Sequence, residues 1–315
     1  MPLPTEATDI RPILTTVGSL PPAHASDDAL VHAVELQRAH DIRLLTNGEP
    51  HGDMLSLYAC IPGIRMGHGI PRVVGRIRPM EDPAQFPTVR DLDRLRSLFP
   101  DERFKVSLTG PTTFLLASAA GGAGPAYRGP MDAALHDDVT EALHPIAREI
   151  GRRGAFLQLD EPVLSQGMRD YGPSLRRLDL LASETARDRA CLHVCGGLVR
   201  TRALDALVRV ERISVLNLAF AGKLEKDNLG LLEPRRWQEH DLRLGAGCSD
   251  VQVSRPEDVM VAGAVESLLR DIVRRVGADH IAFVLPDCGL RATPLEFVDP
   301  ILDGLHGGFV RVFPD

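Results

Sequence analysis

A short segment in the second half of the chain combines residue types that could bind a metal ion. Residues 191–197 read CLHVCGG, so Cys191, His193 and Cys195 alternate with two apolar residues. In a β-strand the side chains of His193 and Cys195, two positions apart, would point to the same face. A further thiol, Cys288, lies in VLPDCGL near the C-terminus. One imidazole and two thiolates are ligands that zinc prefers, and a fourth position would remain for a substrate.

The same residues also have a simpler interpretation. Free cysteine is among the most buried residue types, so an H-x-C segment also fits a buried strand without a metal. The sequence contains no redox C-x-x-C motif. A nucleophilic Cys–His pair would more often place its two members on different elements. The spacing alone therefore leaves a metal site and a buried strand both open.

The elements that must position these residues show a repeating pattern. Short apolar runs ending in glycine or polar residues alternate with longer amphipathic stretches. The eight runs are 13–19, 42–49, 104–111, 155–162, 191–197, 213–220, 242–250 and 281–289, and helices are predicted at 26–41, 131–154, 174–188 and 255–277. Eight alternations predict an α/β fold, a single (β/α)8 TIM barrel over residues 1–315. A doubly wound sheet is disfavoured because no G-x-G-x-x-G loop follows the first run.

Polar residues at the ends of the runs indicate where a site would form. In such a barrel the site lies at the C-terminal ends of the strands. Those ends carry Ser19, Glu49, Thr109, Gly110, Asp160, Glu161, His193, Cys195, Asn217 to Ala219, Cys248, Asp250, Asp287 and Cys288. Closure of the barrel would bring the last strand, with Cys288, beside the first and within reach of the cavity that His193 and Cys195 face. Cys60, outside the runs, is expected to pack in the core.

Composition narrows the class of protein. Hydrophobic residues make up 44% and charged residues 25% of the chain, which is ordinary for a globular protein. The net charge of -7 without a basic run argues against a nucleic-acid or acidic-membrane partner. No stretch approaches the roughly 20 apolar residues of a membrane span, and no secretory signal is visible. Five cysteines do not suggest a disulfide framework, so a reducing cytoplasm is expected.

Six segments, in order, resemble the catalytic C-terminal half of cobalamin-independent methionine synthase, within a wider superfamily that includes uroporphyrinogen decarboxylase. They are TTVGSLPP, LLTNGEPHGDML, VSLTGPTT, FLQLDEPVL, HVCGG and VLPDCGL. The uroporphyrinogen decarboxylase branch has no use for the H-x-C and P-D-C-G positions. The resemblance implies a barrel with catalytic Zn2+, in a short form without the additional N-terminal barrel of the full-length enzymes. It implies a zinc-dependent methyltransferase that converts homocysteine, a small thiol, to methionine.

The resemblance also assigns candidate site residues. It implies that His193, Cys195 and Cys288 are zinc ligands. It implies that the amino-acid substrate is held by Val17, Gly18, Ser19, Glu49 and Asp160. The carboxylates of Glu49 and Asp160 suit an α-ammonium group, and the Val17–Ser19 turn could contact a carboxylate. Glu49, Asp160 and Asp250 are the candidate catalytic residues, although Asp160 and Glu161 could instead both be salt-bridged and cap a strand.

The zinc-ligand set departs from the family pattern at one position. The family's fourth ligand is a glutamate in a segment like V-L-S-L-E-F, where this chain has Ala219 in VLNLAF. One strand later, GAGCSD places Cys248 where the family usually has an apolar residue. We therefore consider two sets of ligands. In one, Cys248 replaces the glutamate; in the other, three ligands leave one position open.

The methyl-donor side departs as well. Gln252 stands where the family has a histidine thought to donate a proton, and glutamine cannot do acid–base work near neutral pH. Ala117 stands in place of the tryptophan against which folate packs, and the single Trp237 is expected to have a packing role. A donor other than methyltetrahydrofolate, such as a methylated corrinoid protein, is therefore credible. Two other functions stay open: an alkyl-thiol transferase or lyase acting on a related thiol, and a degenerate amino-acid-binding barrel without catalysis.

Overall fold

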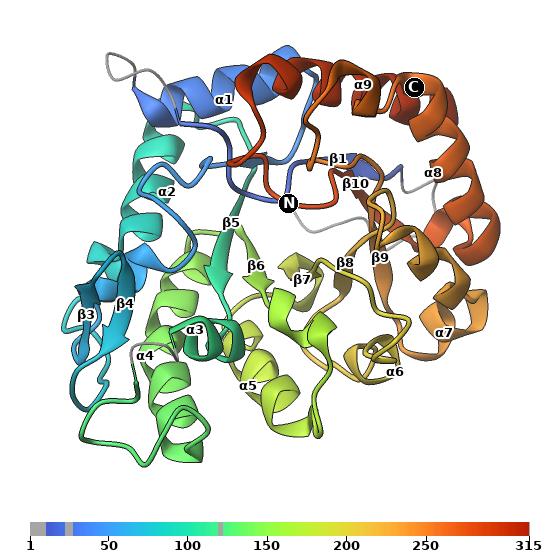
Figure 1. Ribbon diagram of the computed structural model, residues 1–315. Helices are drawn as coiled ribbons and strands as arrows, with labels where there is room; N and C mark the ends of the chain where they lie inside the picture. Colours follow the sequence, from blue (N-terminus) through green and yellow to red (C-terminus); the bar gives the residue numbers. More distant parts are fainter. Residues whose placement is uncertain (1–10, 23–27, 119–121, 315) are drawn as a thin grey trace.

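A computed structural model describes residues 11–22, 28–118 and 122–314, and its centre is a parallel eight-stranded sheet (Figure 1). The strands run in the order β1-β10-β9-β8-β7-β6-β5-β2. Parallel bridges from Thr15 to Leu44 and from Ser19 to Gly48 join the two edges and close the sheet into a barrel. The strands are β1 Ile13–Leu14, β2 Leu45–Thr46, β5 Phe104–Thr109, β6 Phe156–Asp160, β7 Ala190–Val194, β8 Val215–Ala219, β9 Arg243–Gly247 and β10 Ile281–Leu285. The predicted (β/α)8 barrel is confirmed.

Helices surround the barrel and follow the strands in turn (Figure 1). They are α1 Ala29–Ala39, α2 Pro87–Leu98, α3 Pro111–Ser118, α4 Ala133–Arg152, α5 Gly172–Ala182, α6 Leu204–Leu207, α7 Pro234–Glu239, α8 Ala262–Val276 and α9 Leu295–Val312. An antiparallel hairpin, β3 Ile64–Gly67 and β4 Ile70–Val73, is inserted between β2 and α2. Within the described ranges, no helix combines the length and apolar character required to cross a bilayer.

Two of the four predicted helices have bounds that differ by more than three residues from those of the structure. The segment 174–188 was expected to be one helix, but α5 begins at Gly172, with a proline in its first turn, and ends at Ala182. The segment 255–277 begins with a short 3-10 turn at Pro256–Asp258, and α8 starts only at Ala262. The expectation for Cys60 was also wrong: it ends a surface 3-10 segment, Ser56–Cys60, and is exposed.

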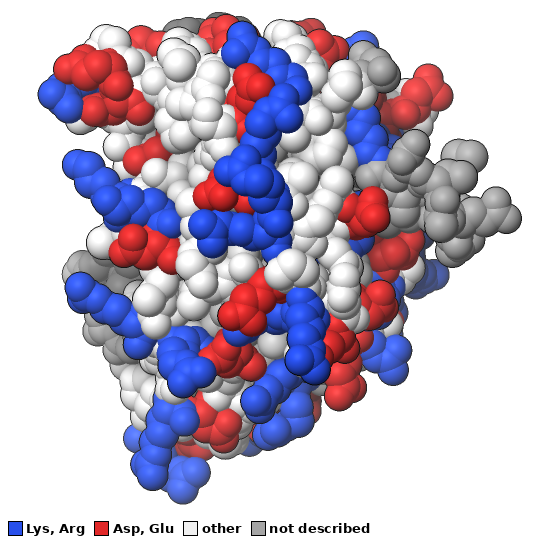
Figure 2. Space-filling model, turned by 90° about the vertical axis from the view of Figure 1, so that its right-hand side faces the viewer, with Lys and Arg blue, Asp and Glu red and all other residues white. Residues whose placement is uncertain are grey.

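Charged residues of both signs alternate on the outer face of α8. Figure 2 shows this side of the molecule, with blue and red side chains next to one another. Arg270 pairs with Glu266, four residues earlier, and Arg275 pairs with Asp271 in the same way. Such i,i+4 pairs are typical of a solvated helix face.

The barrel interior is filled, so a ligand can approach the strand ends only from outside. Near the N-terminal ends of the strands, an apolar cluster includes Phe156 and Phe283, whose rings lie 6.1 Å apart. Above it lies a polar layer. The Lys105 ammonium donates to Gln158 Oε1 at 2.8 Å, and the Asn217 amide donates to the same oxygen at 3.0 Å. The candidate site residues lie above this layer.

Candidate active site

Two thiols and an imidazole come together at the C-terminal end of the barrel. His193 belongs to β7, Cys195 follows that strand directly, and Cys288 lies in the turn after β10. One ligand atom from each of the three lies within 4.8 Å of the others, and the two Sγ atoms are 3.8 Å apart. The structure therefore brings together the three residues predicted as zinc ligands. The alternation of β7 aims His193 and Cys195 to one side, and closure of the barrel brings Cys288 to them.

The donor set suits a soft divalent cation. His193 is only 3% exposed, and neither of its ring nitrogens has a hydrogen-bond partner among the described residues. An orphaned buried imidazole is costly, and a metal ion would satisfy it. The Cys195 thiol and the His193 ring hold the pKa of Cys288 below its usual range despite burial, which favours the thiolate that binds metals. Zinc fits these residues.

Cys248 does not join this group. It follows β9, where Leu244, Ala246 and Cys248 all belong to the apolar cluster packed outside the barrel. Gly245 and Gly247 take the alternate positions, and a side chain at Gly245 would meet the Asn217 amide oxygen inside the barrel at 1.9 Å. Strand alternation therefore turns the Cys248 thiol away from the barrel axis. Burial in these surroundings raises the pKa of the Cys248 thiol well above its usual value. The structure does not support the expectation that Cys248 replaces the missing glutamate.

Two carboxyl groups, those of Glu49 and Asp160, lie beside the metal-ligand group. Asp160 ends β6 and pairs in register with His193, and Gln158 Nε2 donates to its Oδ1 at 2.8 Å. Burial raises the pKa of Asp160 to about 6, although the nearby His193 opposes the shift. Burial and the charge of Asp160 raise the pKa of Glu49 to about 7. Together with Ser107, both line a small cavity at this end of the barrel. The two groups could share a cationic ligand, which would favour their ionised forms.

The backbone around Glu49 is strained. Its φ of 53° lies in the left-handed region, which is uncommon for a residue with a side chain. Gly48 before it has a φ of 72°, and Glu49 N donates to the Asn47 side chain at 3.3 Å. Such strain is often found at functional sites, where the surrounding structure holds it.

The predicted Val17–Ser19 turn lies against Glu49 and the turn that carries Cys288. A side chain at Gly18 would come within 2.5 Å of Glu49 Oε1, so the carboxylate lies directly over this glycine. A side chain at Gly289 would meet the Ser19 hydroxyl at 2.1 Å. A side chain at either position would force one of these polar groups to move. Five predicted substrate residues, Val17, Gly18, Ser19, Glu49 and Asp160, thus lie at the C-terminal ends of β1, β2 and β6.

Other predicted residues lie further from the group. Glu161 accepts from the Thr112 and Thr113 amides at 3.0 and 2.7 Å, so it holds the start of α3. Asp250 is half-buried after β9, accepts from Gln252 N at 2.8 Å, and contributes to the raised pKa of Asp287. Ala117 and Gln252 are exposed, and Trp237 is fully buried, as expected for a packing residue.

Two charged residues near the site were not predicted. Lys105 Nζ lies inside the barrel, with hydrogen bonds to Thr16 O at 2.7 Å and to Gln158. Burial lowers the pKa of Lys105 to about 8. Arg291, three residues beyond Cys288, donates to the backbone oxygen of Glu49. The lysine in the predicted strand FKVSLTG could have indicated a buried polar group near the site, because a charged residue inside a barrel strand usually has a buried partner.

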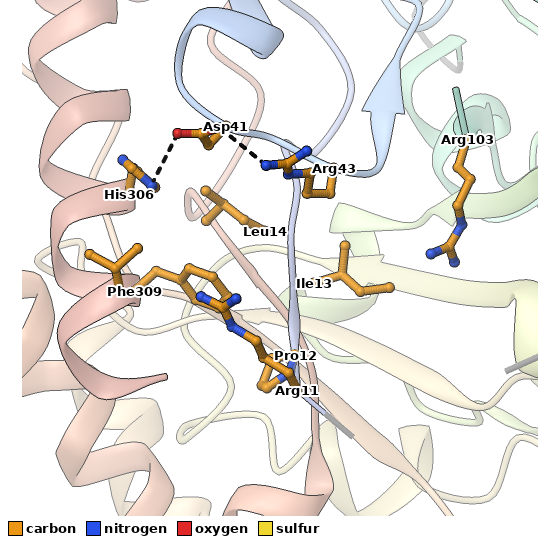
Figure 3. A pocket seen from close by; sticks show the side chains of 10 residues that line it. Arg11, Pro12, Ile13, Leu14, Asp41, Arg43, Arg103, His306 and Phe309 are labelled. Carbon is orange, nitrogen blue, oxygen red and sulfur yellow. Dashed lines mark hydrogen bonds and ion pairs between the residues drawn. The ribbon is translucent and has the colours of Figure 1, made fainter. Parts of the chain in front are cut away.

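A second cavity lies at the opposite end of the barrel, beside the start of β1 (Figure 3). Asp41 pairs there with Arg43 and His306, and the Arg11 guanidinium lies over the Phe309 ring, 5.0 Å from its centroid. In TIM barrels this end contributes to stability, whereas active sites lie at the other end. The strand-end group is therefore the candidate active site.

Comparison with known proteins identifies relatives over most of the chain. The family model described as "Cobalamin-independent synthase, Catalytic domain" matches residues 17–304. A methionine synthase of Methanothermobacter thermautotrophicus is 32% identical over 277 residues, covering 84% of this chain and 83% of the relative. A methionine synthase of Methanocaldococcus jannaschii is 25% identical over 280 residues, covering 85% and 83%.

Solved structures show the same fold. A B12-independent methionine synthase from Shewanella sp. W3-18-1, in complex with selenomethionine, superimposes with a TM-score of 0.75 at 18% identity and covers 95% of this chain and 97% of its own. A putative vitamin-B12 independent methionine synthase from Listeria monocytogenes gives a TM-score of 0.68 at 15% identity, with 97% and 98% coverage.

Proposed function

The chain belongs to the family of cobalamin-independent synthase catalytic domains, and we propose that it is a zinc-dependent methyltransferase that methylates the thiol of homocysteine. The observation that carries this proposal is the juxtaposition of two sets of groups. His193, Cys195 and Cys288 meet at the barrel end where Glu49 and Asp160 line a cavity. A thiol-binding group beside two carboxylates suits an amino acid with a thiol side chain.

The residues of the chain divide the work of holding such a substrate. Glu49 and Asp160 would bind the α-ammonium group, because the positive charge compensates two crowded carboxylates. Gln158 holds Asp160 in place through its 2.8 Å hydrogen bond, and Lys105 in turn orients Gln158. Zinc bound by His193, Cys195 and Cys288 would lower the pKa of the substrate thiol and favour its nucleophilic thiolate.

The methyl donor is proposed to differ from methyltetrahydrofolate. Ala117 is exposed on α3 and offers no aromatic face for a folate ring, and Gln252 offers no titratable group. A methylated corrinoid protein is a donor that needs neither. The unpaired state of all five cysteines is consistent with a proposed cytoplasmic location.

A second candidate keeps the zinc site but changes the substrate. Ala219 at the end of β8 leaves an apolar, fully buried position where the family has a carboxylate. An alkyl-thiol transferase or lyase acting on a related thiol would suit this difference. A binding-only barrel is less consistent with the three assembled ligands, which an amino-acid pocket alone does not need.

Metal analysis and a donor panel test the proposal. Protein purified under reducing conditions should hold about one zinc per chain. With homocysteine it should form methionine from methylcobalamin or a methylated corrinoid protein faster than from methyltetrahydrofolate. Absence of zinc would contradict both enzyme functions. Bound zinc without methionine from any donor would favour the second candidate.

A further inference from the structure

A cationic side chain lies beside Glu49 and donates to its backbone oxygen. An α-amino acid carries a carboxylate as well as an ammonium group, and Glu49 and Asp160 can satisfy only the ammonium. Arg291 lies in the loop after β10, and its Nη2 donates to the backbone oxygen of Glu49. Its charge also acts on the Glu49 and Asp53 carboxyl groups and favours their ionised forms.

The Arg291 guanidinium has unused hydrogen-bonding capacity. Within the described part of the chain, it forms no ion pair within 4.0 Å with a carboxylate, and its buried Nε has no hydrogen-bond acceptor. A guanidinium has five N–H donors in a planar fork that matches a carboxylate. Leaving a buried donor of a charged group without an acceptor is costly unless a ligand completes it. A carboxylate would supply the missing acceptor and match the charge of the guanidinium.

The loop of Arg291 is fixed against the Val17–Ser19 turn. Leu290 N donates to Ser19 O at 2.8 Å, and a side chain at Gly289 would strike the Ser19 hydroxyl. The backbone that carries Arg291 is thus fixed against Ser19, and its guanidinium lies beside Glu49.

We propose that Arg291 binds the α-carboxylate of the substrate and so restricts the enzyme to thiols that carry a complete α-amino acid group. The inference rests on the proposed function and deepens it. An amine thiol without the carboxylate would still find Glu49, Asp160 and the metal ligands. It would lose only the contact with Arg291.

The test compares two ligands that differ by the carboxylate alone. Binding of L-methionine, the proposed product, and of 3-(methylthio)propylamine is measured by calorimetry on zinc-loaded protein. The wild type should bind methionine at least tenfold more tightly. The Arg291→Gln variant should bind methionine about 10- to 100-fold more weakly, because a charge-assisted hydrogen bond contributes about 1.5–3 kcal/mol, and its affinity for the amine should stay within about twofold.

Two further variants separate recognition from folding. Arg291→Lys keeps the charge and should recover part of the affinity for methionine. Arg235→Gln removes an exposed arginine of α7 that pairs with Glu239, and it should leave both affinities unchanged. Equal losses for the two ligands in Arg291→Gln, or equal wild-type affinities for both, would overturn the role of Arg291. The proposed function would still stand if homocysteine is methylated, whereas absence of both methionine binding and turnover would reject both.

Discussion

Replacing Gly18 by alanine tests whether the position of the Glu49 carboxylate matters for the reaction. The backbone of Gly18 lies outside the left-handed region, so alanine adds no backbone strain there. Its Cβ would lie 2.5 Å from Glu49 Oε1 and 2.9 Å from Ser107 Oγ, whereas ordinary contact begins at 3.4 Å. The carboxylate must therefore move by about 0.9 Å, and its strained backbone limits how it can adapt.

The expected loss follows from this displacement. A shift of about 1 Å in a positioning group costs about 10²-fold in rate. We expect kcat/KM for homocysteine to fall by about this factor. The free energy of unfolding should change by about 1 kcal/mol or less, because the end of a half-buried side chain can move aside more easily than a packed core.

Steady-state kinetics, zinc analysis and denaturation measure these three quantities. Gly75→Ala is the matched control, since nothing lies within 4 Å of the added methyl and its backbone is also outside the left-handed region. The control should match the wild type in every assay, and both variants should retain their zinc. Gly18→Ala with kcat/KM within about threefold of the wild type would show that the carboxylate over Gly18 does not hold the substrate.

Three further predictions concern the groups below and beside this carboxylate. Cys195→Ser should lower the affinity for zinc at least about 10²-fold. Cys248→Ala should keep its zinc, and its free energy of unfolding should fall by about 1–2 kcal/mol. Loss of zinc from Cys248→Ala would show that Cys248 is a ligand. Asp160→Asn should weaken methionine binding about tenfold by calorimetry without loss of zinc, and unchanged binding would argue against a bound ammonium. Burial lowers the pKa of Lys105 from 10.5 to about 8, so between these pH values the unfolded chain binds more protons than the folded one. The free energy of unfolding, measured by urea denaturation, should therefore rise with pH in this range by up to about 3 kcal/mol. The Lys105→Met variant should lack this rise, and an identical rise in the variant would refute the assignment to Lys105.

The barrel could be predicted because its signal is repeated. Eight runs with polar ends are hard to arrange in another way once each is followed by an amphipathic stretch. Helix bounds were less well predicted, since the start of α8 at Ala262 depends on a 3-10 turn that precedes it. Cys60 was placed incorrectly because an apolar neighbourhood in the sequence does not show that its segment lies in a surface insertion.

The positions of the site residues could be predicted only where they follow from the alternation of side chains along a strand and from the place of active sites at strand ends. His193 and Cys195 share a face by the period of two, and the strand-end rule places Cys288 near them. The same period, applied from Gly247, turns Cys248 outward and favours the ligand set without it. The contact between Gly18 and Glu49, and the bond from Arg291 to Glu49, depend on loop conformations that no periodicity encodes.

The loss of the family glutamate at Ala219 bears on the number of protein ligands. Cys248 faces away from the barrel. Asp287 is a carboxylate close to Ala219, and it accepts from the Phe220, Ala221 and Gly222 amides at 3.0, 2.9 and 2.7 Å. A carboxylate held by three backbone donors would have to give up these bonds to turn toward a metal. Among the described residues, His193, Cys195 and Cys288 form the ligand group. A zinc ion held by these three residues would keep one exchangeable position, which is the arrangement of catalytic rather than structural zinc, and the proposed thiol substrate would take that position.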